Sequence, residues 1–98
     1  MTIHRKVKRA RDGDTLELYR KINGSNFVRL ANVNAPELYQ FGGKEAQRRL
    51  NSRTQGKTVT VQPVGRSYGR VVANVRRNRR LIRWRDLLLM LERTLKEI

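Results

Sequence analysis

Residues 14–33 read DTLELYRKINGSNFVRLANV, and this stretch predicts the β-hairpin that decides the fold. In Asp14–Tyr19 apolar residues alternate with polar ones, which is the period of a strand with one buried face. Asn23-Gly24 is a strong signal for a tight hairpin turn. The segment Asn26–Val33 is apolar on both faces and predicts the second strand of the hairpin.

Three further segments predict strands on either side of this hairpin. Ile3–Arg9 precedes it and carries apolar residues at a period of two. After it, Thr58–Val61 alternates cleanly and Arg70–Val75 returns as a fifth strand. The proline and glycine residues within Pro63–Gly69 predict a loop between these last two strands.

Two segments predict helices. In Lys44–Thr54, Ala46 and Leu50 fall on one helical face, and Gly56 follows as a stop signal. In Trp84–Ile98, apolar residues recur at helical spacing. The apolar stripe of this last segment predicts packing on the core.

The order of the predicted elements is three strands, a helix, two strands and a final helix. This order is typical of an OB-fold, a five-stranded Greek-key barrel that often binds nucleotide chains across its face. An SH3-like barrel lacks the helix between strands three and four. Since the sequence shows no repeat and no linker, we expect one mainly β domain over residues 1–98.

The charge of the chain predicts a polyanionic partner. There are 23 Lys and Arg against 8 Asp and Glu, which gives a formal charge of +15. Nucleic acid is the expected partner. The basic clusters at Arg5–Arg11 and Arg76–Arg85 are either solvated surfaces or phosphate contacts, and the high charge favours phosphate contacts. An acidic membrane surface is the alternative, but the basic residues do not gather on one amphipathic helix.

The residue types also limit the metal chemistry and the location of the chain. It has no cysteine, and its single histidine, His4, excludes a multi-histidine zinc centre, so a bound metal is expected to have oxygen ligands. No apolar run approaches the ~20 residues of a membrane span, and Met1–Arg11 lacks the apolar segment of a signal peptide. We expect a soluble monomer, in the cytoplasm or exported after removal of a signal.

Two acidic residues flank a glycine in Asp12-Gly13-Asp14. Asp14 is in phase with Leu16 and Leu18, so the strand pattern predicts that its carboxylate points toward the barrel. A carboxylate in that place needs a partner. The alternative interpretation is an Asx-turn, in which Asp12 or Asp14 hydrogen-bonds the backbone around Gly13.

Residues 29–37, RLANVNAPE, place a cation inside an apolar strand. Burying a guanidinium alone is costly, so Arg29 is expected to be paired or to hold an anion. The simpler interpretation is a salt bridge between Arg29 and Glu37. Glu37 on its own is equally compatible with a solvated loop residue.

Tyr68-Gly69-Arg70 brings an aromatic hydroxyl and a second arginine to the start of the last strand. An ordinary hairpin explains this turn equally well. Together with the residues above, however, the set suits a phosphodiester. Arginine guanidinium groups bind phosphate oxygens through pairs of hydrogen bonds. A metal with oxygen ligands polarises the phosphorus, and a carboxylate activates the attacking water.

Five short segments resemble, in order, the signatures of the staphylococcal nuclease (thermonuclease) family. They span about residues 7–75 and are Asp12–Thr15, Val28–Leu30, Ala35–Glu37, Gly43–Ala46 and Tyr68–Arg70. Five such segments in the same order are quite specific. The resemblance implies an OB-fold and a calcium-dependent nuclease that cuts DNA and RNA to leave 3′-phosphates.

The resemblance also implies a calcium site. Asp14 matches the first calcium carboxylate of the family, and Asn34 takes the place of the second, which is usually aspartate. Ala35 matches a position whose backbone carbonyl binds calcium. Asn34 is the main departure from the family pattern, because it removes one negative charge from the site.

For the other site residues the resemblance implies roles in catalysis and substrate binding. Glu37 matches the general base that activates water, and Arg29 and Arg70 match the two arginines that hold the scissile phosphate. Tyr68 matches a tyrosine beside the nucleotide. Arg66 lies in the loop before it, which is more basic than is usual in the family, and is a further candidate for nucleic-acid binding.

The function expected from the sequence is therefore a metal-dependent nuclease, with calcium as the expected metal, that acts on DNA or RNA with little sequence specificity. The alternative is a catalytically weak OB-fold module that binds nucleic acid, and Asn34 is the best argument for it. A purely structural protein of the ribosomal type explains the charge but not the set of site residues.

Overall fold

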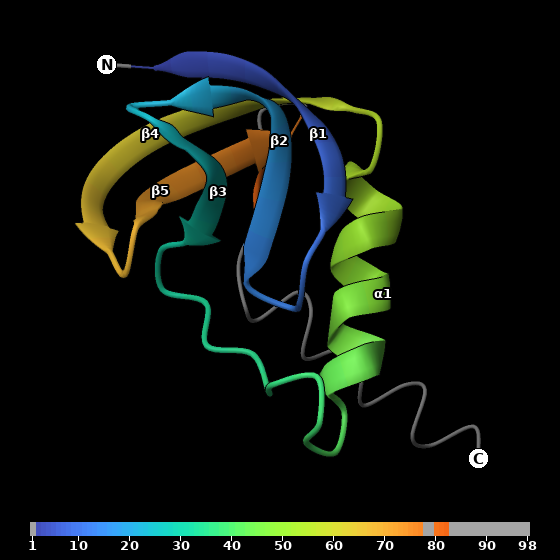
Figure 1. Cartoon of the computed structure of the whole chain (residues 1–98). Coiled ribbons are helices and arrows are strands. Elements are labelled where there is room, and N and C mark those ends of the chain that lie inside the picture. The colour runs from blue at the N-terminus through green and yellow to red at the C-terminus, as the bar shows by residue number, and fades with distance from the viewer. Residues whose placement is uncertain (1, 78–79, 83–98) are drawn as a thin grey trace.

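The computed structural model describes residues 2–77 and 80–82 (Figure 1). In chain order its elements are β1 (Ile3–Ala10), β2 (Thr15–Ile22), β3 (Ser25–Leu30), α1 (Gly43–Thr54), β4 (Thr58–Ser67), β5 (Arg70–Arg77) and β6 (Arg80–Leu81). The predicted order of strands and of the first helix is confirmed. The helix predicted over Trp84–Ile98 lies outside the described residues.

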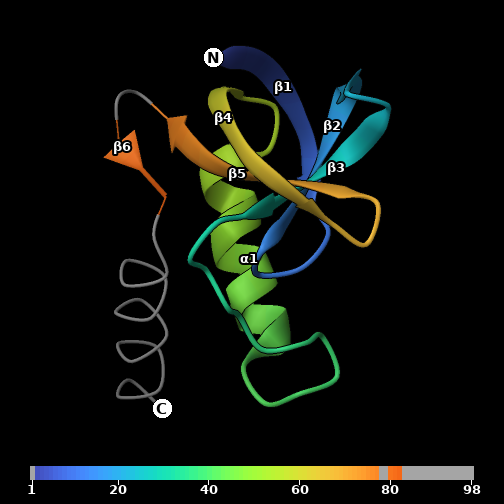
Figure 2. The same cartoon turned by 90° about the vertical axis from the view of Figure 1, so that its left-hand side faces the viewer.

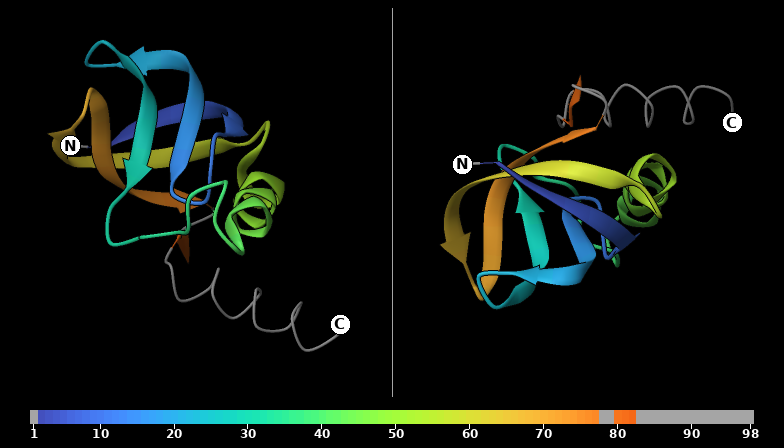
Figure 3. Two further views of the ribbon diagram at one scale, coloured as in Figure 1. Left: turned by 60° about the horizontal axis from the view of Figure 1, so that its bottom comes forward. Right: turned by 90° about the horizontal axis from the view of Figure 1, so that it is seen from above.

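The strands form a closed barrel. They are hydrogen-bonded in the order β3-β2-β1-β4-β5-β6, and a parallel pairing of β3 with β5 closes the ring. The views from below and above show β1 to β5 curling around a common centre, with α1 on one side (Figure 3). This five-stranded barrel, with a helix between β3 and β4, confirms the expected OB-fold.

Aliphatic side chains from all five long strands fill the barrel. Val28 of β3 pairs with Leu16 of β2 on one side and with Val71 of β5 on the other, so that three strands contribute to one layer. Burying each of these side chains contributes roughly 1.5–3 kcal/mol relative to leaving it exposed. The buried core comprises Val7, Ala10, Leu16, Leu18, Ile22, Val28, Leu30, Val33, Leu50, Val59, Val61, Val71, Ala73, Val75 and Ile82.

β4 is longer than the sequence pattern predicts. The loop expected over Pro63–Gly69 is wrong, because β4 continues to Ser67 and the turn is confined to Tyr68 and Gly69. The pairing of β4 with β5 shifts register between Pro63 and Gly65. A bulge of this kind accommodates proline, which cannot donate a ladder hydrogen bond.

β3, in contrast, ends earlier than expected. The prediction placed its end at Val33, but the strand stops at Leu30 and Asn32 adopts a φ of 62°. The amide of Val33 then donates to the carbonyl of Leu30. This turn sends the chain out of the sheet and into the loop that leads to α1.

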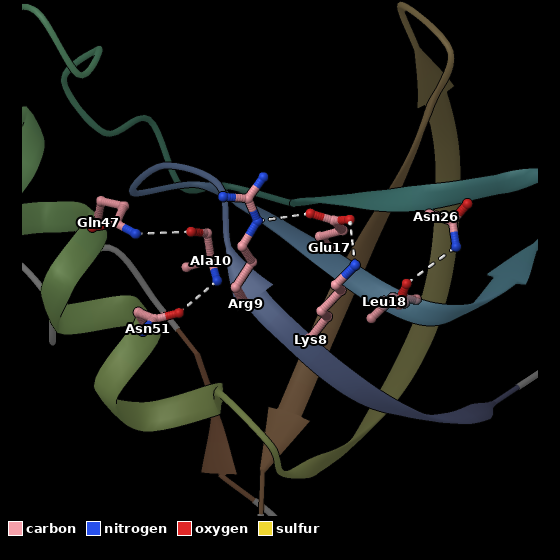
Figure 4. Close-up of polar contacts among 8 residues, drawn as sticks. All are labelled: Lys8, Arg9, Ala10, Glu17, Leu18, Asn26, Gln47 and Asn51. Carbon is pink, nitrogen blue, oxygen red and sulfur yellow. Dashed lines mark hydrogen bonds and ion pairs between the residues drawn. The ribbon is translucent and has the colours of Figure 1, made fainter.

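α1 lies beside the end of β1 (Figure 1). β6 pairs with β5 in the antiparallel direction (Figure 2). The amide of Ala10 donates to Asn51 Oδ1 at 2.8 Å, and Gln47 Nε2 donates to the carbonyl of Ala10 at 2.9 Å (Figure 4). The two side-chain amides thus satisfy the backbone of the last residue of β1. No helix within residues 2–77 and 80–82 is long and apolar enough to cross a membrane.

Gly13 allows the turn between β1 and β2 to approach two other segments closely. A Cβ atom on this residue would lie 2.5 Å from Ala35 Cβ and 2.7 Å from Ala46 Cβ. Ala46 belongs to α1, and Ala35 belongs to the loop after β3. The missing side chain therefore lets the turn, the helix and the loop meet.

We expect Gly13→Ala to lower the free energy of unfolding by about 1–3 kcal/mol, because the added methyl group overpacks two Cβ atoms that cannot rotate away. The melting temperature, followed by circular dichroism, should fall by about 4–8 °C per kcal/mol for a domain of this size. Gly65→Ala is the matched control, since a Cβ atom there meets nothing within 4 Å. Equal losses in the two variants would contradict the packing argument.

Candidate functional site

The hydroxyl of Thr15 joins a cluster of polar side chains at the start of β2. It donates a hydrogen bond to Asp14 Oδ1 at 3.1 Å and accepts one from Arg70 Nη1 at 3.2 Å. Arg29 Nη2 lies 3.8 Å from Asp14 Oδ2. The structure thus brings together a carboxylate, a hydroxyl and two guanidinium groups. Thr15 itself is fully buried.

The register of the barrel explains why these residues meet. Thr15 pairs with Arg29 across β2 and β3, and Arg29 pairs with Val72 across β3 and β5. Arg70 precedes Val72 by two residues and therefore projects from the same face. The neighbouring core residue Val28 points into the barrel, so the cluster lies on the outer face of its wall.

In the turn before β2, Asp12 forms the Asx-turn and Asp14 supplies the carboxylate of the cluster. Asp12 Oδ1 accepts a hydrogen bond from the amide of Asp14 at 3.0 Å, which confirms the Asx-turn for Asp12. The side chain of Asp14 remains available for the cluster and is 14% exposed. This carboxylate contacts Thr15 and Arg29, so the prediction that it points toward the barrel with Leu16 and Leu18 is wrong. The strand alternation does not extend to Asp14, because β2 begins only at Thr15.

The pKa of Asp14 is raised from 3.8 to about 6. Burial is the largest cause, because it penalises the charged carboxylate, and the hydrogen bond and negative charge of Asp12 act in the same direction. The hydrogen bond from Thr15 and the charge of Arg29 lower the pKa but do not outweigh these effects. Additional positive charge beside Asp14 would therefore favour its ionised form.

Arg29 pairs with Asp14 and not with Glu37, so the simple salt bridge considered from the sequence is wrong. Glu37 is exposed, and within residues 2–77 and 80–82 its carboxylate makes no hydrogen bond or ion pair. Its backbone is held, because its amide donates to Gln40 Oε1 at 2.8 Å. A Cβ atom on Gly43 would overlap the Glu37 carbonyl oxygen, so glycine at the start of α1 allows this close approach.

Asn34 and Ala35 lie on the same loop as Glu37. Ala35 is the residue that packs against Gly13, so the loop passes directly beside the turn that carries Asp14. The side chain of Asn34 is exposed. In the part of the chain that the structure describes, no three His, Cys, Asp or Glu side chains gather in a group that could hold a metal ion.

Tyr68 and Arg66 lie at the hairpin between β4 and β5. Tyr68 is 94% exposed and occupies the turn with a φ of 51°. Arg66 Nη1 donates to the carbonyl of Asn23 at 2.9 Å, which ties this hairpin to the turn between β2 and β3. Arg66 therefore has a structural contact in addition to the predicted contact with nucleic acid.

Thr15 is the site residue that sequence reasoning did not select. It was visible as the last residue of the Asp12–Thr15 segment, but the spacing gives no reason to prefer its hydroxyl over that of any other strand threonine. Its role follows from the closure of the barrel, which brings Arg70 to it from a position far along the chain.

The fold and the cluster define an OB-fold domain with two arginines and a carboxylate at one outer site. The chain matches no protein-family model. It is similar to a protein described as an uncharacterized endonuclease from Escherichia coli, and to one with the same description from Escherichia coli O157:H7. Each is 39% identical over 74 residues, which cover 74% of this chain and 48% of the relative. The chain thus spans about half the length of these curated relatives.

The raised pKa of Asp14 predicts a pH dependence of stability in a metal-free buffer. Between about pH 4 and 6 the folded chain keeps a proton that the unfolded chain has released, so the contribution of Asp14 to stability falls as the pH rises through this range. As the pH rises from about 4 to 6, the melting temperature of the natural chain should therefore fall relative to the melting temperature of Asp14→Asn.

A carbon-detected NMR titration of the Asp14 carboxyl group checks the same prediction directly. We expect a midpoint near pH 6, and a lower one in Asp12→Asn, since that variant removes a neighbouring negative charge. A midpoint near 3.8 in the natural chain would contradict the environment described for Asp14.

Proposed function

We propose that this chain is a metal-dependent nuclease domain that hydrolyses phosphodiester bonds of DNA or RNA with little sequence specificity, and that calcium is its metal. The observation that carries the proposal is the cluster in which Asp14 and Thr15 hold Arg29 and Arg70 in one site. The similarity to two proteins described as endonucleases and the formal charge of +15 support this substrate class.

Arg29 and Arg70 are the proposed phosphate ligands. Their present contacts are long: 3.8 Å from Arg29 to Asp14 and 3.2 Å from Arg70 to Thr15, against about 2.7–2.9 Å for a strong charge-assisted hydrogen bond. Both guanidinium groups therefore retain donors for phosphate oxygens. Contacts to phosphate carry no sequence information, which is why we expect little sequence specificity.

Calcium is the proposed metal because the candidate ligands are oxygen atoms. We propose Asp14, the side-chain oxygen of Asn34 and the backbone carbonyl of Ala35 as its ligands, because a hard cation prefers oxygen. The contact between Gly13 and Ala35 supports the pairing of these segments. Burial and the neighbouring Asp12 raise the pKa of Asp14, and a bound cation would favour its ionised form. When bound, such a cation neutralises charge on the phosphoryl oxygen.

Asp12 offsets part of the charge that Asn34 lacks. It lies close enough to Asp14 to raise the pKa of that residue through a hydrogen bond and through its charge. The turn therefore contributes two acidic groups to the neighbourhood of the proposed site. This arrangement supports cation binding despite asparagine at position 34.

Glu37 is the proposed general base. Its carboxylate is exposed and unpaired within residues 2–77 and 80–82, while its backbone is fixed by Gln40 and Gly43. It would accept a proton from the attacking water as oxygen bonds to phosphorus. Arg29 and Arg70 would stabilise the charge on the phosphoryl oxygens while the bond to the leaving oxygen breaks.

An OB-fold module that binds nucleic acid without cutting it is the second candidate. Two observations favour it: Asn34 lacks a ligand charge, and the Glu37 carboxylate makes no contact with the cluster. Incubation of plasmid DNA and of RNA with calcium, magnesium or manganese separates the candidates. Cleavage in calcium that a chelator abolishes supports the nuclease, whereas intact substrate in all three metals, with binding retained, supports the module.

Glu37→Gln should reduce kcat by about 10²-fold or more while nucleic-acid affinity stays unchanged, as expected for the loss of a general base. Single-turnover cleavage and equilibrium binding measure the two quantities. Glu45→Gln is the control, because it removes an acid that pairs with Arg49 on α1. Parallel loss of binding and cleavage in Glu37→Gln would indicate a structural role.

Asn34→Asp should raise the affinity for calcium and lower the calcium concentration needed for cleavage, because it adds a ligand charge with almost no change in size. Isothermal titration calorimetry measures the affinity, with Asn32→Asp as the control on the preceding turn. If calcium binds no more tightly to Asn34→Asp than to the natural chain, Asn34 does not belong to a metal site.

A further inference from the structure

We propose that a single strand of nucleic acid follows the outer face of β1, β2 and β3, leading away from the Arg29 and Arg70 site, and that Glu17 occupies part of this path in the free protein. The proposal rests on the proposed function and names the surface on which the substrate lies. We call this surface the outer β1–β3 face; it carries Lys6, Lys8, Arg9, Arg11, Glu17, Tyr19 and Phe27.

The strand register makes this face continuous with the site. Arg9 pairs with Glu17, and Glu17 pairs with Phe27, so these three residues form one row across β1, β2 and β3. The adjacent row contains Thr15 and Arg29 of the cluster. Residues on one face of a strand repeat every second position, so Phe27 follows Arg29 directly on this surface.

Each aromatic ring on the face has a cation over it. The guanidinium carbon of Arg11 lies 5.0 Å from the centre of the Phe27 ring, next to the cluster. At the far end, Lys6 Nζ lies 5.7 Å from the centre of the Tyr19 ring, which is largely exposed. From Thr15 to Tyr19 the face extends about 13 Å, from the usual rise per strand residue.

A β-bulge adds a second cation in the middle of the face. The register of β1 against β2 shifts between Val7 and Arg9, and both Lys8 and Arg9 reach Glu17 as a result (Figure 4). Arg9 Nε lies 2.8 Å from Glu17 Oε1, and Lys8 Nζ lies 3.8 Å from Glu17 Oε2. The two cations remain 60% and 54% exposed, so a phosphate has access to them.

A single strand is the occupant that this pattern fits. Cations alone would suit any polyanion, but the exposed ring of Tyr19 beside them offers a stacking surface for an unpaired base, as in barrels that bind single-stranded nucleic acid. In a duplex the bases are already stacked on one another, so Tyr19 would gain little from it.

Glu17 is then an internal competitor for the strand. The hydrogen bond from Arg9 lowers the pKa of Glu17, so this carboxylate stays ionised and holds the same donors that a phosphate would use. A bound strand has to displace it from Arg9 and Lys8. Removing the charge of Glu17 should therefore strengthen binding.

The first test compares two exposed arginines, Arg9→Gln on the face and Arg48→Gln on α1. Binding of a fluorescent single-stranded oligothymidylate is measured by anisotropy over a salt series in a chelating buffer. Arg9→Gln should weaken binding several-fold and reduce the slope of log affinity against log salt by about 0.7, the value for one contact to a single strand. Equal effects of the two variants would overturn the path.

The second test compares two paired acids, Glu17→Gln and Glu45→Gln. Each variant removes one negative charge; the first breaks the ion pairs with Arg9 and Lys8, and the second breaks the pair with Arg49. Glu17→Gln should bind the oligonucleotide several-fold more tightly, and Glu45→Gln should change the affinity much less. Unchanged or weaker binding by Glu17→Gln would overturn its role as a competitor.

A third variant, Tyr19→Ser, tests the choice of a single strand. It should weaken binding of the oligothymidylate without changing the salt slope, because stacking is not an electrostatic contact. Unchanged affinity would overturn the single strand as occupant. All these binding measurements are made without metal, so they are independent of cleavage. If the chain binds along this face but does not cleave, the proposed nuclease function is wrong and the proposed binding path still holds.

Discussion

The parallel pairing of β3 with β5 is the interaction on which the site depends. It closes the barrel, and it places Val72 beside Arg29, so that Arg70 reaches the hydroxyl of Thr15 from the far end of the chain. Without this pairing the two arginines would belong to opposite edges of an open sheet. The same closure buries Val28, Val71 and Ala73, so the apolar core and the polar site are stabilised by one set of backbone hydrogen bonds.

A second constraint is the close packing at Gly13. It joins the acidic turn to α1 and to the loop after β3, and so fixes the approach of the two segments that carry the proposed metal ligands. The environment of Asp14 in this site does not favour the stability of the folded chain at neutral pH. A carboxylate whose pKa is raised to about 6 is held where its charge is disfavoured, which is common at functional sites.

Much of the fold was predictable from local patterns. The alternation of Leu16 and Leu18, followed by Asn23-Gly24, is sufficient to predict the hairpin, because side-chain period and turn chemistry agree. The loop predicted over Pro63–Gly69 failed for a physical reason. Proline and glycine mark bulges as well as loops, and only the partner strand decides between them.

The residues of the site could be predicted from the sequence, but their contacts with one another could not. Asp14, Arg29 and Arg70 were found from their types and order, and the structure brings them together. The partner of Arg29 and the role of Thr15 depend on barrel closure, which no local pattern encodes. The outer β1–β3 face is a further example, since a bulge aims Lys8 and Arg9 at one carboxylate.

The central claim is that Arg29 and Arg70 hold one phosphate beside the Asp14 carboxylate. The most direct measurement is a crystal structure of the chain with calcium and a dinucleotide whose linkage is a slowly cleaved phosphorothioate. We predict that both guanidinium groups contact the same phosphorothioate, with the metal bound to Asp14. Arginines that contact different phosphates, or a dinucleotide bound away from Asp14, would contradict it.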